Sequence, residues 1–249
     1  MNKKSAFFQI SLVFSLLFSI FSGVNVRAYD NPTQNCDSDF WDNIYNVDEK
    51  KLVAEIPDSN IRLYYIKEDK DLGSYLNFIL QIKDGKKYFR WENVNNNTTY
   101  APQLTLADLD KDGKEEIIVQ LCKGYGTGVY DGEVHVIRQE FFDEVLVENP
   151  IIILHKNEIT LREFPEHFEV TLNHKKITIN KKGRVTPPYS KIGIGWGNYN
   201  TRYEVKNNTL FARVPLVIGV TYAGEFVVKY KFKDDILQME SIDFFDYER

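Results

Sequence analysis

The sequence contains little cysteine and little histidine, and this limits the chemistry that it can support. There are two cysteines, Cys36 and Cys122, and four histidines in 249 residues. Two thiols do not form the disulfide framework of a small secreted domain. One bridge between them and two unrelated apolar side chains are both compatible with the sequence. Three histidines, His155, His167 and His174, lack the spacing that is typical of zinc ligands.

Local catalytic motifs are also missing. The chain has no G-x-S-x-G nucleophile turn, no H-E-x-x-H zinc motif and no cysteine–histidine signature. The glycine-rich residues 124–128 lack the G-x-G-x-x-G spacing of a phosphate-binding loop, so we expect a bend or bulge between strands there. No catalytic residue is assigned from the sequence, although a pair of catalytic carboxylates would leave no such motif.

Apolar runs long enough to cross a membrane are lacking after the first residues. Residues 5–23 are apolar and uncharged and follow Lys3 and Lys4, and small residues stand at Val26 and Ala28. This pattern predicts a secretory signal peptide at residues 1–28, cleaved after Ala28. The protein is then extracellular or in the cell envelope and has no membrane segment. The alternative is an uncleaved N-terminal membrane anchor.

Excess positive charge is lacking as well. Cleavage after Ala28 would remove Lys3, Lys4 and Arg27 and no acidic residue, which changes the formal net charge from −5 to −8. Such a chain is an improbable partner for nucleic acid. With 43% hydrophobic and 14% aromatic residues it can bury a substantial core. We expect a single mainly-β domain at residues 29–249, either undivided or with two subdomains divided near the Pro- and Gly-rich residues 184–199.

Alternation of apolar and polar residues is the main pattern that is present, and it predicts strands. The expected strands are residues 51–56, 61–67, 75–83, 86–91, 115–121, 133–138, 151–155, 167–172, 176–180, 201–205, 209–214, 225–233 and 236–244. Short turns at residues 83–86, 173–175, 207–208 and 233–235 favour hairpins. The expected fold is therefore mainly β, with antiparallel hairpin-rich sheets in a sandwich or a propeller-like meander. One or two short helices are expected: a helical stretch at residues 39–45 and another short turn at residues 139–145.

Carboxylates alternate along one short segment, LADLDKDGKEEIIV, at residues 106–119. Calcium takes six to eight oxygen ligands, and the D-x-D-x-D-G pattern supplies several of them around a sharp turn at Gly113. The expected calcium ligands are the side chains of Asp108, Asp110, Asp112 and Glu116 and the main-chain carbonyl of Lys114. The bland alternative is an acidic turn that only keeps an exposed loop soluble.

The residues after these carboxylates argue against an EF-hand. An EF-hand needs a bidentate Glu at the twelfth position and a helix on each side, but that position is Val119 and the residues around it predict a strand. We therefore expect a calcium loop between two strands, in which the ion stabilises the turn rather than takes part in a reaction.

The carboxylate segment resembles the calcium loop of FG-GAP and VCBS-type repeats. Residues 100–136 as a whole, with LTLADLDKDGKEEIIV followed by GYGTGVYDGEVHV, resemble small secreted proteins of Gram-positive bacteria that have no assigned activity. The repeat families imply ligation by the five residues named above. Two features depart from those families. The last carboxylate is Glu116 and not Asp, and the motif occurs once, whereas a propeller repeats it in several blades.

Two further features have a functional and a structural interpretation. Glu133 and His135 lie two apart and so share one side of a strand, where they would form an acid/base or metal pair or would simply pack. The aromatic residues, including Trp41, Trp91 and Trp196, are expected to pack in the core or, less favourably, to line a carbohydrate or peptide surface.

The sequence therefore favours a secreted calcium-binding β protein that acts as a binding or surface-interaction module. Its partner would be an extracellular ligand or a surface component that the sequence does not specify. The alternative is a secreted hydrolase in which Glu133, His135 or the acidic residues of the loop lie near a cleft that calcium orders.

Overall fold

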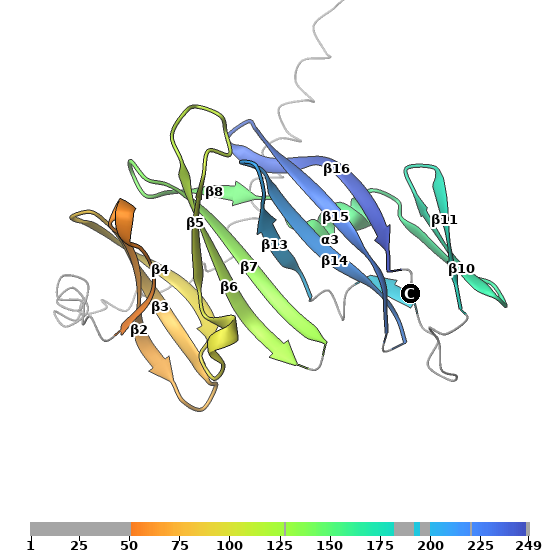
Figure 1. The fold of residues 1–249 in the computed structure, drawn as a ribbon, viewed down its shortest axis with the longest axis horizontal. Coiled ribbons are helices and arrows are strands. Elements are labelled where there is room, and N and C mark those ends of the chain that lie inside the picture. The colour runs from red at the N-terminus through yellow and green to blue at the C-terminus, as the bar shows by residue number, and fades with distance from the viewer. Residues whose placement is uncertain (1–50, 127, 182–191, 195–199, 220, 248–249) are drawn as a thin grey trace, which may run out of the picture. The chain divides into compact units, whose positions relative to one another are not determined.

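Strands make up most of the part of the chain that the computed structural model describes, which is residues 51–126, 128–181, 192–194, 200–219 and 221–247 (Figure 1). These residues belong to one unit, and the prediction of a mainly-β fold with antiparallel sheets is confirmed. The signal peptide at residues 1–28, the helix expected at residues 39–45, Trp41 and Trp196 lie outside the described residues, as does most of the segment 184–199.

A four-stranded antiparallel sheet comes first. Its strands, in spatial order, are β1 (Leu52–Ile56), β2 (Ile61–Asp69), β3 (Ser74–Ile82) and β4 (Gly85–Val94). A 3-10 turn, η2 (Pro57–Ser59), joins β1 to β2, and a second one, η3 (Thr98–Tyr100), follows β4. The expected turn between β3 and β4 is present, and Lys83 has φ +54 there.

A nine-stranded sheet follows, and its order is β12-β14-β15-β16-β8-β7-β6-β5 with β13 also paired to β14. The bounds are β5 (Gln103–Ala107), β6 (Glu116–Gly126), β7 (Val129–Arg138), β8 (Asp143–Val147), β12 (Ile192–Ile194), β13 (Arg202–Val205), β14 (Leu210–Ile218), β15 (Thr221–Lys233) and β16 (Ile236–Asp246). Only β16 and β8 pair in parallel among the described strands, over two residues on each strand. This short pairing connects the two antiparallel halves of the sheet.

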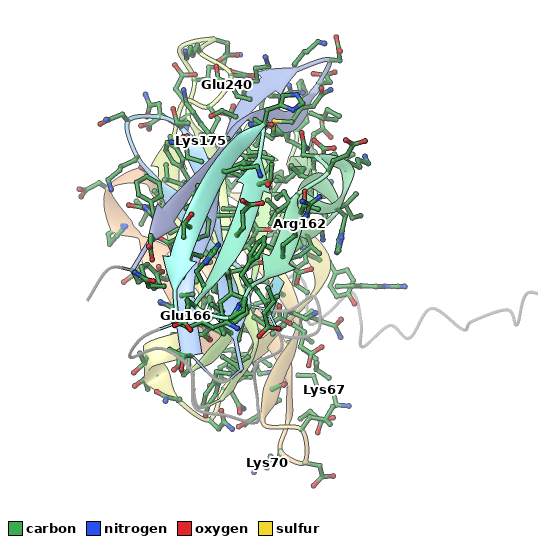
Figure 2. All side chains as sticks on the ribbon, turned by 90° about the vertical axis from the view of Figure 1, so that its right-hand side faces the viewer. Lys67, Lys70, Arg162, Glu166, Lys175 and Glu240 are labelled. Carbon is green, nitrogen blue, oxygen red and sulfur yellow. The ribbon has the colours of Figure 1, made fainter. Side chains whose placement is uncertain are left out.

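The third sheet is small and contains β11 (Lys175–Asn180), β10 (His167–Leu172) and β9 (Thr160–Glu163) in that order. Figure 2 shows it with Arg162 on one outer strand and Lys175 on the other. The turn between β10 and β11 has two successive residues with positive φ, Asn173 and His174, at +49 and +65. Such pairs match the twist of a two-residue hairpin, and the same holds for Asn207–Asn208 and Asp234–Asp235.

The strand expected at residues 151–155 is wrong, because these residues lie in a helix, α3 (Pro150–Lys156). Asn149 caps the helix by accepting hydrogen bonds from the backbone N–H groups of Ile151 and Ile152, and Pro150 occupies the first turn. An Asn-Pro pair before an apolar run is a helix start signal, and it outweighed the apolar pattern.

Three strands had no counterpart among the expected ones: β5, β8 and β9. The turn expected at residues 139–145 extends only over residues 139–142, after which β8 begins. β12 lies within the segment 184–199 and pairs with β14, so at least this part of the segment belongs to the large sheet. No helix among the described residues is long and apolar enough to span a membrane.

Strands β6 and β7 are buried on both faces, which explains the uninterrupted apolar run at residues 117–119. Ile117, Val119 and Ile137 belong to a core cluster with residues of β2, β3 and β4. Ile118 and Val136 belong to a second cluster, which contains residues of α3, β10 and β14 to β16. The four-stranded sheet therefore packs on one face of β6 and β7, and helix α3 and the small sheet contribute to the core on the other.

Candidate functional site

The carboxylate loop, residues 108–116, joins β5 to β6 (Figure 1). Its own acidic side chains organise its backbone. Asp110 Oδ1 accepts a hydrogen bond from the N–H of Asp112 at 3.1 Å, and Asp112 Oδ1 accepts one from the N–H of Lys114 at 2.7 Å. Gly113 has φ +89, a left-handed conformation that favours glycine over residues with a side chain.

Three of the predicted ligands converge. Asp108, Asp110 and Glu116 each offer a carboxylate oxygen, and these oxygens lie within 4.8 Å of one another. Asp112 is not part of this group, and its exposed side chain faces the backbone of Lys114 instead. The local pattern thus brings together both ends of the loop, Asp108 and Glu116, although seven residues separate them.

Glu116 is the most buried member of the group, with only 4% of its surface exposed. Its Oε2 accepts a hydrogen bond from the N–H of Leu109 at 2.8 Å, which closes the base of the loop. Burial, and to a smaller extent the charges of Asp110, Asp112 and Asp108, raise the pKa of the Glu116 carboxyl. The loop therefore holds a carboxylate where its negative charge is costly.

Within the described residues, positive charge offsets the negative charge of these carboxylates only weakly. A cation beside the loop is Arg138, whose Nη2 lies 3.8 Å from Asp110 Oδ2 but only 2.8 Å from Asp235 Oδ1. Two like charges 4.8 Å apart, the upper limit of the distances among these oxygens, repel each other by about 3 kcal/mol at an effective dielectric constant of about 20. Asp108 Oδ1 is buried and has no hydrogen-bond partner among the described residues, although Asp108 Oδ2 accepts one from Gly113. A hard cation among these oxygens would relieve both costs.

Among the described residues, the side chain of Lys114 forms its ion pair with Glu140 and not with the three carboxylates, with Nζ 3.1 Å from Oε2. Beside it, Gln139 Nε2 donates a hydrogen bond to the carbonyl of Glu115 at 2.6 Å. The turn between β7 and β8 is therefore fastened to the end of the carboxylate loop. Ligation by the Lys114 carbonyl, like ligation by Asp112, stays a prediction.

Glu133 and His135 do lie on one side of β7, and the fold adds partners that the local sequence does not reveal. The ring of His135 stacks on Trp91 of β4, with centroids 4.4 Å apart. His135 Nδ1 lies 2.6 Å from Glu144 Oε1, and Nε2 lies 3.6 Å from Glu133 Oε2. We call the five charged residues here the His135 cluster: Glu92, Lys123, Glu133, His135 and Glu144.

The charges of the His135 cluster compensate one another. Lys123 Nζ lies 3.5 Å from Glu133 and 3.7 Å from Glu92. Burial disfavours the charged imidazolium, but the two glutamates together outweigh it, so the pKa of His135 is raised. The nearby His135, opposed in part by burial and helped by the charge of Lys123, lowers the pKa of Glu133. The cluster is thus suited to stabilising charged pairs between the sheets.

Access to His135 is limited, because only 11% of its side chain is exposed and Trp91 covers one ring face. Neither His135 nor Glu133 lines either of the two pockets that the described residues form around the loop. The arrangement that the hydrolase alternative requires, a cleft that joins this pair to another carboxylate, is not present at these pockets. Trp91 itself is 6% exposed and stacks on Phe89, so it packs in the core as the favoured interpretation predicts.

The glycine-rich residues 124–128 adjoin the expected bulge, since the pairing register of β6 and β7 shifts between Cys122 and Gly124. Cys122 is a free, buried thiol whose Sγ–H donates to the carbonyl of Gly124, and Cys36 lies outside the described residues. Close by, Gly132 donates its N–H to the carbonyl of Thr201. A Cβ on Gly132 would lie 2.5 Å from that oxygen, so this glycine serves chain packing.

A pocket of about 940 Å³ adjoins the carboxylate loop. Three connections line it: the β3–β4 turn with Ile82, Lys83 and Gly85, the loop with Asp112 and residues 114–116, and the β7–β8 turn with residues 138–143. Sequence patterns did not indicate this pocket, because its walls come from three separate parts of the chain. We call it the Phe141 pocket after an apolar side chain of its wall that is 68% exposed.

Comparison of the chain with models of protein families, with curated proteins and with solved structures finds no match in any of the three.

Proposed function

We propose that the protein is a secreted binding or surface-interaction module whose carboxylate loop holds a structural calcium ion. The observation that carries the metal site is the convergence of Asp108, Asp110 and the buried Glu116, together with the partnerless Oδ1 of Asp108 among the described residues. A turn that is acidic only for solubility would have no reason to bury a carboxylate beside two others.

Calcium suits the donor set better than the alternatives. All the donors are oxygens, which argues against zinc and copper, since these favour softer ligands. Magnesium prefers octahedral coordination and retains several waters, whereas calcium accepts irregular cages of carboxylates, carbonyls and water. In the proposed site Asp108, Asp110 and Glu116 hold the ion, and Asp112 and the Lys114 carbonyl complete the predicted set. The ion would neutralise the loop and fix its exit into β6.

The binding role is supported by the surroundings of the loop. The same segment that would hold calcium also lines the Phe141 pocket, so an ordered loop gives this pocket a fixed wall. The His135 cluster gives no comparable support for the hydrolase alternative, because it is stacked under Trp91 and its charges are paired.

Titration calorimetry of residues 29–249 tests the metal site. We expect calcium uptake at ~10⁻⁴ to 10⁻³ M, as in many extracellular modules, and weaker uptake of magnesium. Asp108→Asn and Asp110→Asn preserve side-chain shape and remove one charge each, so each should weaken calcium binding at least about tenfold, or about 1.4 kcal/mol.

Asp84→Asn is the matched control, since Asp84 is an exposed aspartate before a glycine in the β3–β4 turn. It should leave the calcium affinity unchanged. Absence of calcium uptake at millimolar concentrations, or an equal loss in the control, would refute the metal site. Export is tested separately by the mass of the protein recovered outside the cells, which should begin at Tyr29.

A further inference from the structure

The Phe141 pocket combines an apolar wall with unpaired negative charge. Phe141 is 68% exposed, while the adjacent Phe142 packs against Gly85, where an added Cβ would lie 3.1 Å from its ring. Phe142 has φ +56, and its carbonyl accepts a hydrogen bond from Lys87 Nζ at 2.9 Å. The second phenylalanine is thus held in place by the turn, and the first is left exposed to solvent.

Carboxylates outnumber cations on the walls of this pocket. The lining carboxylates are Asp112, Glu115, Glu116, Glu140 and Asp143, and the lining cations are Lys83, Lys114 and Arg138. Two of the cations already have partners, because Lys114 pairs with Glu140 and Arg138 with Asp235.

The unpaired charges that remain on the walls of the pocket are mostly negative. Within the described part of the chain, Asp112, Glu115 and Asp143 take part in no ion pair, and all three are exposed. Lys83 is the one lining cation that is left to oppose them among the described residues. Calcium on Asp108, Asp110 and Glu116, with Asp112 completing the predicted set, would leave Glu115 and Asp143 available, since neither of them is among the proposed ligands. An anionic ligand would therefore be repelled and a cationic one attracted.

We infer that the Phe141 pocket binds a basic, partly apolar peptide segment, in which a Lys or Arg lies beside an aliphatic or aromatic side chain. The apolar side chain packs on Phe141, and the basic groups lie near Glu115 and Asp143. A volume of about 940 Å³ accommodates a few residues of an extended peptide. This inference rests on the proposed role as a binding module and identifies the class of its partner.

Calorimetry with three capped pentapeptides tests the inference. Their sequences are Lys-Phe-Lys-Leu-Lys, its acidic counterpart Glu-Phe-Glu-Leu-Glu, and Lys-Ser-Lys-Ser-Lys without apolar side chains. The first should bind at least about tenfold more tightly than either of the others, because each of them lacks one of the two complementary features. Equal affinity for the three peptides, or preference for the acidic one, would overturn the inference.

Two variants locate the binding site. Phe141→Ser and Asp143→Lys alter exposed side chains of the pocket, so both proteins should fold, and each should weaken binding of the basic apolar peptide at least about fivefold. Phe245→Ser is the control, since Phe245 is 54% exposed on β16 and does not line the pocket. Loss of binding in the control alone, or no loss in the two pocket variants, would also overturn the inference.

Each titration is repeated with calcium and with chelator, next to the calcium titration itself. Calcium uptake without Phe141-dependent peptide binding would overturn the pocket assignment and leave the metal site standing. Phe141-dependent peptide binding without calcium uptake would overturn the metal site and leave the pocket assignment standing. Vesicles with anionic lipid serve as the competing partner class, and binding to them in place of the basic peptide would contradict the inference.

Discussion

The carboxylate loop and the His135 cluster are two charged regions that share strand β6, and they handle charge in opposite ways. In the loop, three carboxylates converge within nine consecutive residues, one of them buried and one with an oxygen that has no partner among the described residues. In the His135 cluster, residues of β4, β6, β7 and β8 contribute both signs, and each cation faces two glutamates.

This comparison separates a site whose proposed cation comes from solution from a site that contains its own cations. In the proposed metal site the loop supplies the donors and the solution supplies the cation, so the stability of the loop should depend on what the solution contains. The His135 cluster contains its own cations, so its stability should depend on the protein itself and on pH. Substitution, calcium and pH should each affect the two regions differently, with effects that decrease in that order.

Removal of the central imidazole should have the largest effect on folding. His135→Ala leaves Glu133 and Glu144 without their shared cation and removes the stacking partner of Trp91, so we expect a loss of about 2 kcal/mol in the free energy of unfolding. Urea denaturation measures this loss. His174→Ala, in an exposed turn, is the control and should cost less than about 0.5 kcal/mol. Unchanged calcium affinity in His135→Ala would support the independence of the two regions.

Calcium should have the next largest effect on the free energy of unfolding. At a calcium concentration of about ten times the dissociation constant, ligation stabilises the folded state by about 1.4 kcal/mol, and chelator should remove this gain. The gain should persist in His135→Ala and fall to about 0.4 kcal/mol or less in Asp108→Asn. Persistence of the full gain in Asp108→Asn would show that calcium acts somewhere other than at the loop.

The dependence of stability on pH should be smaller, and in the His135 cluster it should come from His135 and Glu133. A raised pKa in the folded state means that His135 contributes stability fully below about pH 6.5, its value in the unfolded chain, and that this contribution is lost as pH rises through the folded pKa. The lowered pKa of Glu133 acts at the other end, since its contribution is present above about pH 4.3 and is lost as pH falls.

The difference in unfolding free energy between the wild type and His135→Ala therefore should be largest between about pH 5 and about pH 6.5 and decrease towards about pH 9. Denaturation curves at several pH values measure it, and the subtraction cancels the titration of groups elsewhere. A difference that grew as pH rose from about 6.5 to about 9 would contradict the assigned direction of the His135 pKa.

Much of the fold was predictable because strand period and turn chemistry are local. The hairpin turns at residues 173–175, 207–208 and 233–235 were expected from their Asn and Asp residues, and all three contain successive residues with positive φ. The apolar residues 151–155 could not be assigned by periodicity alone, and the deciding signal was the preceding Asn149-Pro150. Strand β5 was missed because QLTLA is short, and β8 because a turn was extended across its start.

The features of the candidate site also divide into those that the local sequence determines and those that depend on the tertiary structure. The sequence alone determined the carboxylate loop, because its donors and its glycine lie within nine consecutive residues and the turn forms locally. Only the tertiary structure decided that Asp112 lies outside the converging group, that Glu116 is buried and that Trp91, Lys123 and Glu144 meet around His135. The tertiary structure also forms the Phe141 pocket, since three separate turns make up its walls. The physical reason is that burial and the pairing of charges depend on which strands become neighbours, and this is set by the packing of the whole core.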